Sequence, residues 1–134
     1  NKNDKVRQEA LNSIHRIGGD DGGPVLMSVL PQVDEIFQIS VVEELGKLKY
    51  AAAMPKLVAM LKSRSFLVSS LRTDMEVMIC TTLGKIGAAE AVPILQEVCK
   101  TGFLTLKPYP EKVRSAAARA LQEINRQKMS HQRP

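Results

Sequence analysis

The chain has 134 residues, of which 44% are hydrophobic, 25% charged and 4% aromatic, and its formal net charge is +5. This composition and length fit one ordinary soluble globular domain, and we expect one domain and not two. A chain of this size buries about two thirds of its unfolded surface, so we expect a core that needs neither a metal nor disulfides. No apolar run approaches the roughly 18 residues of a membrane span, and the amino terminus lacks a signal-peptide pattern.

The cysteines and the first residue indicate the setting of the chain. Cys80 and Cys99 are too few and too far apart for a CxxC pair or a secreted disulfide framework. We therefore expect a reducing, cytoplasmic environment. The sequence begins with Asn1 and not with methionine, from which we expect a fragment or module of a larger protein.

The first predicted element is a helix near 4–18, with Asp4 as a plausible N-cap. Its inner face carries apolar residues at helical spacing: Val6, Ala10, Ile14 and Ile17. A glycine-rich break at 18–23 follows. The second helix, near 23–31, has Pro24 in its first turn, where the missing amide hydrogen costs nothing.

The second pair of helices follows the same plan. The helix near 34–49 is N-capped by Asp34 and carries an apolar stripe: Phe37, Val41, Leu45 and Leu48. A break at 49–50 separates it from the helix near 52–62, which has Pro55 in its first turn. No segment of the chain alternates in the manner of a strand.

The third pair is predicted near 73–87 and 90–101. Thr73 and Glu76 form a T-x-x-E capping box at the start of the first helix, and Pro93 lies near the start of the second.

The last predicted helix, near 110–127, has no second helix after it, and residues 128–134 form a polar tail. Its apolar stripe would be exposed unless the preceding connection covers it: Val113, Ala117, Leu121 and Ile124. Such an exposed stripe predicts self-association through the end of the fold or contact with another domain of the same chain.

The helix pairs repeat along the chain. Residues 83–100 align without a gap on residues 45–62 at an offset of 38, and an offset of 31 relates the first two pairs. The units lie near 4–31, 34–62, 73–101 and 110–127. Stacked pairs bury their apolar stripes between neighbours in one continuous core. The predicted fold is all-α, an α-solenoid of antiparallel helix pairs with about three and a half repeats in residues 1–127.

The repeated motifs resemble a known family. The pattern D-x-V-R-x-x-A-x-x-x-I-x-x-I-G from Asp4 to Gly18, and LGKIGAAEAVPIL from Leu83 to Leu95, look like HEAT repeats of the bacterial type, an armadillo-like helical family. Arg7 matches the usual Val-Arg pair of that family. Arg114 matches it too, while the middle copies carry Gln38 and Glu76. The resemblance implies the fold, because the matched positions are nearly all packing positions.

The connections at 62–74 and 100–112 are longer than the first and carry apolar residues where loops are usually polar. At the 38-residue offset three apolar pairs align: Phe66 with Leu104, Val68 with Leu106, and Leu71 with Tyr109. These residues either fold back over the edge of the core or form a paired, partly apolar ridge for a partner.

Most of the basic excess lies in these two connections and in the tail. Equivalent connections stack on one edge of a solenoid, so six basic residues can form one positive strip: Lys62, Arg64, Arg72, Lys100, Lys107 and Lys112. A strip of this kind attracts phosphate or an acidic protein surface. The alternative is that these side chains are solvated and only keep the protein soluble.

Catalytic interpretations find little support in the sequence. His15 and His131 are far apart and fit no metal-ligand spacing, and we expect no metal, cofactor or catalytic residue. The positions of Cys80 and Cys99 in the repeat predict small buried hydrophobic residues and not nucleophiles. Catalytic members of the resembled family, bilin lyases among them, share only the general repeat pattern with this chain.

The predicted function is a non-catalytic scaffold for protein–protein interaction, which uses the curved surface formed by the second helices. Residues off the core stripe of these helices would be exposed: Met27, Ser28, Lys56, Val58, Ala59, Lys62, Gln96, Glu97 and Lys100. The candidate partner-binding residues are Lys56, Val58, Lys62, Arg64, Phe66, Arg72, Gln96, Lys100, Lys107 and Tyr109. The alternative function is sequence-independent nucleic-acid binding through the basic edge.

Overall fold

The computed structural model describes residues 2–17, 19–63, 69–101 and 107–132, and for residues 2, 3, 14, 15, 17, 19 and 20 it describes the backbone alone. The described residues form helices and no strand. The α-helices are α1 (Lys2–Ile17), α2 (Gly19–Val29), α3 (Glu35–Lys47), α4 (Met54–Lys62), α5 (Ser70–Ile86), α6 (Val92–Val98) and α7 (Glu111–Gln132). Short 3₁₀ turns at Leu30–Gln32, Ala51–Ala53 and Ala89–Ala91 adjoin α2, α4 and α6.

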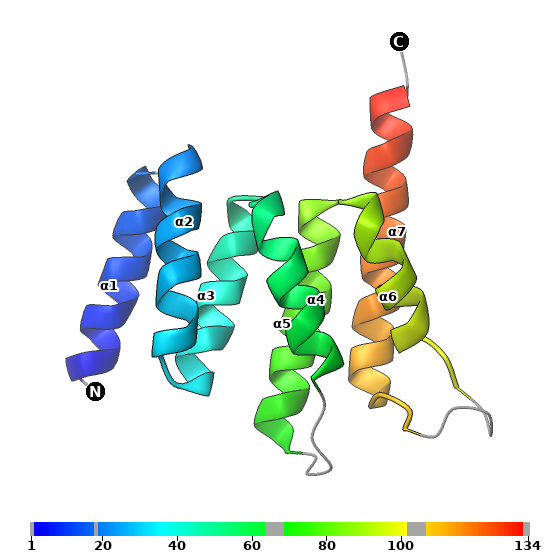
Figure 1. Cartoon of the computed structure of the whole chain (residues 1–134), viewed down its shortest axis with the longest axis horizontal. Coiled ribbons are helices and arrows are strands. Elements are labelled where there is room, and N and C mark those ends of the chain that lie inside the picture. Colours follow the sequence, from blue (N-terminus) through cyan, green and yellow to red (C-terminus); the bar gives the residue numbers. More distant parts are fainter. Residues whose placement is uncertain (1, 18, 64–68, 102–106, 133–134) are drawn as a thin grey trace.

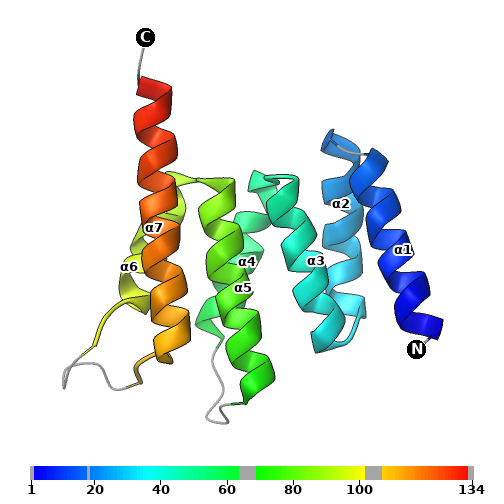
Figure 2. The same ribbon diagram turned by 180° about the vertical axis from the view of Figure 1, so that it is seen from behind.

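The helices form two layers. Figure 1 shows α2, α4 and α6 in the front layer, and Figure 2, from behind, shows α1, α3, α5 and α7 side by side. Successive helices are antiparallel, so the chain advances along the stack by one helix pair at a time. This arrangement confirms the predicted all-α solenoid.

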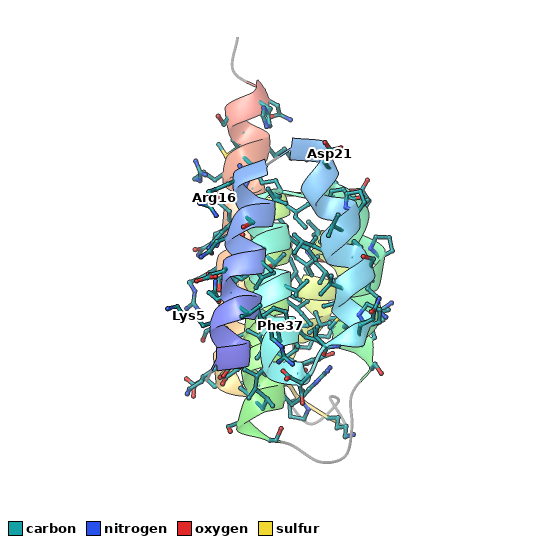
Figure 3. All side chains as sticks on the ribbon, turned by 90° about the vertical axis from the view of Figure 1, so that its left-hand side faces the viewer. Lys5, Arg16, Asp21 and Phe37 are labelled. Carbon is teal, nitrogen blue, oxygen red and sulfur yellow. The ribbon has the colours of Figure 1, made fainter. Side chains whose placement is uncertain are left out.

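The core lies between the two layers and follows the repeat. Val41, Leu45 and Leu57 are fully buried, as are Ile79, Leu83 and Leu95, which follow them by 38 residues. Figure 3 looks onto the α1 end of the stack, where core side chains fill the space between the layers. Lys5 and Arg16 on α1 point away from that core.

Two local start signals are confirmed. Asp34 is the N-cap of α3, and its carboxylate accepts a hydrogen bond of 2.9 Å from the Phe37 amide. Pro55 and Pro93 stand in the first turns of α4 and α6, where the missing amide hydrogen has no helical acceptor to lose.

The predicted start of α5 is wrong. The N-cap is Ser69, whose hydroxyl accepts from the Arg72 amide at 3.0 Å, and α5 begins at Ser70. Thr73 lies inside the helix, and its hydroxyl donates to the Ser69 carbonyl at 3.1 Å. The chain thus offers two N-cap residues of similar strength, and the earlier one adds three residues to the helix.

Other boundaries also differ from the predicted ones, and three of them change the role given to a residue or segment. α1 begins at Lys2, so Asp4 lies in its first turn and is not its N-cap. Val6 and Ala10, predicted on its inner face, are exposed, because the side of α1 that faces the core carries Leu11. α2 begins at Gly19, which places Pro24 inside the helix. The expected polar tail is helical as far as Gln132, because polar residues such as Gln, Lys and Arg sustain an exposed helix well.

Neighbouring first-layer helices approach one another closely at small residues. A Cβ atom built on Gly84 of α5 would lie 2.8 Å from the Ala120 Cα of α7. One repeat upstream, a Cβ on Gly46 of α3 would lie 3.0 Å from Thr82 Oγ1 of α5. Thr82 Oγ1 donates to the Val42 carbonyl at 3.0 Å, so this buried hydroxyl is satisfied across the same contact.

Candidate functional site

The outward face of the second layer carries four of the ten candidate partner-binding residues, Lys56, Lys62, Gln96 and Lys100. Ser28, Lys56, Ala59, Lys62, Gln96, Glu97 and Lys100 are exposed there, as the helical spacing predicts. Val58 and Met27 are half-buried and pack against the core. The prediction that these two residues are exposed is therefore wrong. They are half-buried because the flanking first-layer helices cover the sides of each second-layer helix.

The described ends of the two long connections lie at one edge of the stack, the lower edge in Figure 1. Lys62 ends α4, and the exposed Lys100, Lys107 and Lys112 lie near the ends of α6 and α7. Lys100 Nζ pairs with Glu97 Oε2 at 2.8 Å, which offsets part of the charge. The candidates Arg64 and Phe66 lie outside the described residues, as do the apolar partners at 104 and 106.

Arg72 does not belong to this basic strip. Its side chain is 20% exposed and turns inward, where NH2 donates to the Met60 carbonyl at 2.7 Å. Its Nε lies 3.8 Å from Oε1 of the buried Glu76. Arg72 therefore joins α5 to α4 inside the fold, and its predicted place in an exposed strip is wrong.

Tyr109 is also held by the fold. The side chain is half-buried, and its hydroxyl donates to the Leu61 carbonyl at the end of α4 at 3.0 Å. Arg114 NH1 donates to the Tyr109 carbonyl at 2.6 Å. These contacts place residues 107–110 of the second connection back over the edge of the core. For this part of the connection, the structure agrees with the predicted fold-back and not with the predicted ridge for a partner.

The four positions equivalent to the Val-Arg arginine make four different contacts. Arg7 NH1 pairs with Asp34 Oδ2 at 2.9 Å, and its guanidinium carbon lies 5.4 Å from the centre of the Phe37 ring. The Phe37 amide and Arg7 together lower the pKa of Asp34. Gln38 donates to the Leu30 carbonyl at 2.9 Å, the buried Glu76 has its Oε1 3.8 Å from Arg72 Nε, and Arg114 NH1 donates to the Tyr109 carbonyl at 2.6 Å. The stack is therefore held by local contacts at each step.

Both cysteines were predicted to be buried. The structure confirms this for Cys80, whereas Cys99 is only half-buried. Cys80 is fully buried, and burial raises the pKa of its thiol to about 12. Cys99 is half-buried, and burial raises its pKa as well. A thiol of this kind stays protonated near neutral pH and is a poor nucleophile.

Within the residues that the structure describes, no three His, Cys, Asp or Glu side chains gather closely enough to hold a metal ion. The described helices include none that is both long and apolar enough to cross a bilayer.

A groove that the sequence analysis missed runs between α5 and α7. It has a volume of about 380 Å³, a floor of small residues at Gly84, Ala116 and Ala120, and a rim that includes Arg119 and Glu123. Arg126, 2.6 Å from Glu123, lowers the pKa of that carboxylate to about 2. One repeat upstream, the position equivalent to Ala116 is occupied by the larger Met78. The run of small residues in α7 was therefore the sequence signal that could have predicted this groove.

A second groove, of about 350 Å³, lies between α6 and α7 at the end of the stack. Val92 of α6 and Leu121 and Ile124 of α7 are its apolar lining. The prediction that the apolar stripe of the last helix is exposed is wrong. Val113, Ala117 and Ile124 are buried, and Leu121 is half-buried. The described chain covers most of this stripe with α5 and α6, and only the groove remains open.

Residues 81–101 match the family model described as PBS lyase HEAT-like repeat. The match covers the end of α5, the turn after it and α6, and it confirms the resemblance to HEAT-like repeats. No curated protein and no solved structure matches the chain.

Proposed function

We propose that the chain is a non-catalytic scaffold for protein–protein interaction, which binds a partner along the outward face of α2, α4 and α6. The observation that carries this proposal is the separation of the core from that face. The core is continuous through all the stacked pairs, while Lys56, Ala59 and Gln96 are exposed in neighbouring second-layer helices. A stack of this kind presents an extended surface at fixed spacing, which suits recognition of another protein.

The matched repeat supports a structural role more than a catalytic one. Leu83, Ala91, Ile94, Leu95 and Val98 of the matched residues are buried in the core. The model is named after a lyase, but what it matches here is a set of packing positions. The buried, protonated Cys80 thiol adds no nucleophile.

Charge reversal on the second layer tests the proposal. The face variant carries Lys56→Glu, Lys62→Glu and Lys100→Glu, and the matched control carries three reversals of exposed first-layer residues, Lys5→Glu, Lys85→Glu and Arg119→Glu. Each variant and the wild type would be used to capture partners by cross-linking, with quantification by mass spectrometry and circular dichroism as a check on folding.

A protein captured by the wild type and by the control, but lost with the face variant, would support the proposal. Equal capture by both variants would exclude the second-layer face as the binding surface. Absence of any enriched protein with the folded wild type would count against a scaffold role.

A further inference from the structure

The groove between α5 and α7 lies in the first layer, which faces the viewer in Figure 2. Both of its walls are described helices, so the groove is not an open end of the stack. Its apolar floor consists of Gly84, Ala116 and Ala120, and the exposed Lys85 and Arg119 line its rim. Its volume of about 380 Å³ lies within the range of ligand-binding clefts.

The equivalent contact one repeat upstream, between α3 and α5, differs in the residue that fills it. Met78 occupies the position of Ala116 there, and its side chain packs against the core. Alanine lacks most of the methionine side chain, and the space is left open at the α5–α7 contact. The groove is therefore specific to this pair of helices and is not a general feature of the repeat.

The charge of the two contacts differs as well. Lys47, the equivalent of Lys85, has its Nζ 3.0 Å from Oε1 of Glu44 and 3.6 Å from Oε1 of Glu43, so its charge is balanced within the fold. At the α5–α7 contact, threonines stand at the positions equivalent to both glutamates. The lysine is kept there, and the two carboxylates that balance it upstream are absent.

The rim of the α5–α7 groove therefore carries two cations without an acidic partner. Within the described residues, neither Lys85 nor Arg119 makes an ion pair. Glu123 lies on the same rim, but its two oxygens accept hydrogen bonds of 2.9 Å and 2.6 Å from Arg126, which balances its charge. The groove thus combines an apolar floor with an excess of positive charge.

We propose that this groove binds an acidic segment of a partner protein, with an aspartate or glutamate between Lys85 and Arg119 and a neighbouring apolar side chain on the floor. The planar guanidinium of an arginine suits a carboxylate, which it can bind through two hydrogen bonds. A second hollow of about 330 Å³ shares Arg119 and continues the groove as far as Val77. From Val77 to Lys85, α5 spans about 12 Å at 1.5 Å per residue, which is room for about four extended residues.

Two other occupants fit this surface less well. The whole chain has a net charge of +5, so a second copy is repelled where an acidic protein is attracted. Nucleic acid could pair its phosphates with Lys85 and Arg119, but its backbone offers no aliphatic group to the buried alanines of the floor. The groove lies on the opposite side of the fold from the second-layer face, so this proposal and the proposed function can fail independently.

The probe is a set of fluorescein-labelled hexapeptides that carry one glutamate beside leucine, valine or alanine, each matched by a peptide with glutamine in place of glutamate. In fluorescence anisotropy at about 150 mM salt, we expect saturable binding of a glutamate peptide to the full chain and binding about fivefold to tenfold weaker with its glutamine match. Lys85→Gln with Arg119→Gln should weaken binding about tenfold. Lys5→Gln with Arg16→Gln, which removes two cations that point outward from α1, should leave it unchanged.

The floor is tested by refilling the groove. Ala116→Met introduces the residue that the repeat carries one unit upstream, and it should weaken peptide binding about tenfold. Circular dichroism and the urea midpoint show whether this variant is folded. Thr81→Met, at a half-buried position on the opposite wall, narrows the groove without changing the floor and replaces Ala116→Met if that variant does not fold.

Three results would overturn the proposal. The first is the absence of saturable binding of any glutamate peptide to the folded chain, or binding equally strong when Lys85 and Arg119 are neutralised. The second is binding that Ala116→Met does not change and that polyglutamate or single-stranded DNA reproduces, which would identify an unspecific anion site. The third is self-association that Ala116→Met abolishes in analytical ultracentrifugation, which would identify a second copy as the occupant.

Discussion

Replacement of Gly84 by alanine tests how closely α5 and α7 are packed. The new Cβ would lie 2.8 Å from the Ala120 Cα and 2.9 Å from its Cβ, and a backbone atom of another helix cannot move aside alone. Overpacking of this kind costs about 2–3 kcal/mol, and the higher helix propensity of alanine returns about 1 kcal/mol. We expect a net loss of about 1–2 kcal/mol in the free energy of unfolding.

The matched variant is Gly46→Ala at the equivalent position between α3 and α5. Its Cβ meets the Thr82 side chain at 3.0 Å and 3.2 Å, and a side chain adjusts more easily than a backbone. The cost and the propensity gain should therefore nearly cancel, with a change below about 1 kcal/mol.

Urea unfolding followed by circular dichroism measures both variants, and the melting temperature of Gly84→Ala should fall by about 3–8 °C. The double variant Gly84→Ala with Ala120→Gly should recover part of the loss, because it removes one of the two close contacts. If Gly84→Ala proved as stable as the wild type or more stable, α5 and α7 would not approach as closely as described.

Lys49 has a positive φ of 51°, at the position that Gly87 occupies in the next unit. Because glycine adopts this conformation without strain, Lys49→Gly should raise the free energy of unfolding by about 0.5–1 kcal/mol in urea unfolding. Lys49→Ala should give no such gain. The pKa of Asp34 is lowered in the folded state, so its contribution to stability is present above the unfolded pKa of about 4 and is lost as the pH falls towards the folded value. Urea midpoints measured between about pH 6 and pH 2 should show a smaller loss for Asp34→Asn, which keeps the cap and removes the charge. Cys99 should react with a thiol reagent faster than Cys80, whose pKa of about 12 and full burial leave it protonated until the chain unfolds. Rapid reaction of Cys80 in a Cys99→Ala variant under native conditions would contradict its burial.

Helix identity and the repeat followed from local patterns. The spacing of Val41 and Leu45 indicates the inner face of a helix wherever the helix is placed, and the same spacing at Ile79 and Leu83 indicates the repeat. Asp34, Pro55 and Pro93 act within a single helical turn, so their roles were predicted from adjacent residues alone. The start of α5 was missed because Ser69 and Thr73 are both good N-caps, and the choice depends on contacts of the first turn.

The candidate site was predicted in part. Lys56, Gln96 and Lys100 are exposed as expected, because they lie opposite the core stripe of their helices. Arg72 was placed wrongly because a long arginine can reach either solvent or a buried carbonyl, and only the position of Met60 in α4 shows which.

The sequence by itself determined that the chain forms stacked antiparallel helix pairs and, for the helices after α1, which side carries the core stripe, since both follow from spacing within one helix and from its repetition. Tertiary structure alone decided which of these sides is covered and by what. The burial of Val113 and Ala117, the inward turn of Arg72 and the open groove at Leu121 all depend on neighbours distant in the chain. Such contacts leave no periodic signal, because packing between layers is set by the shapes of helices that meet only in the folded state.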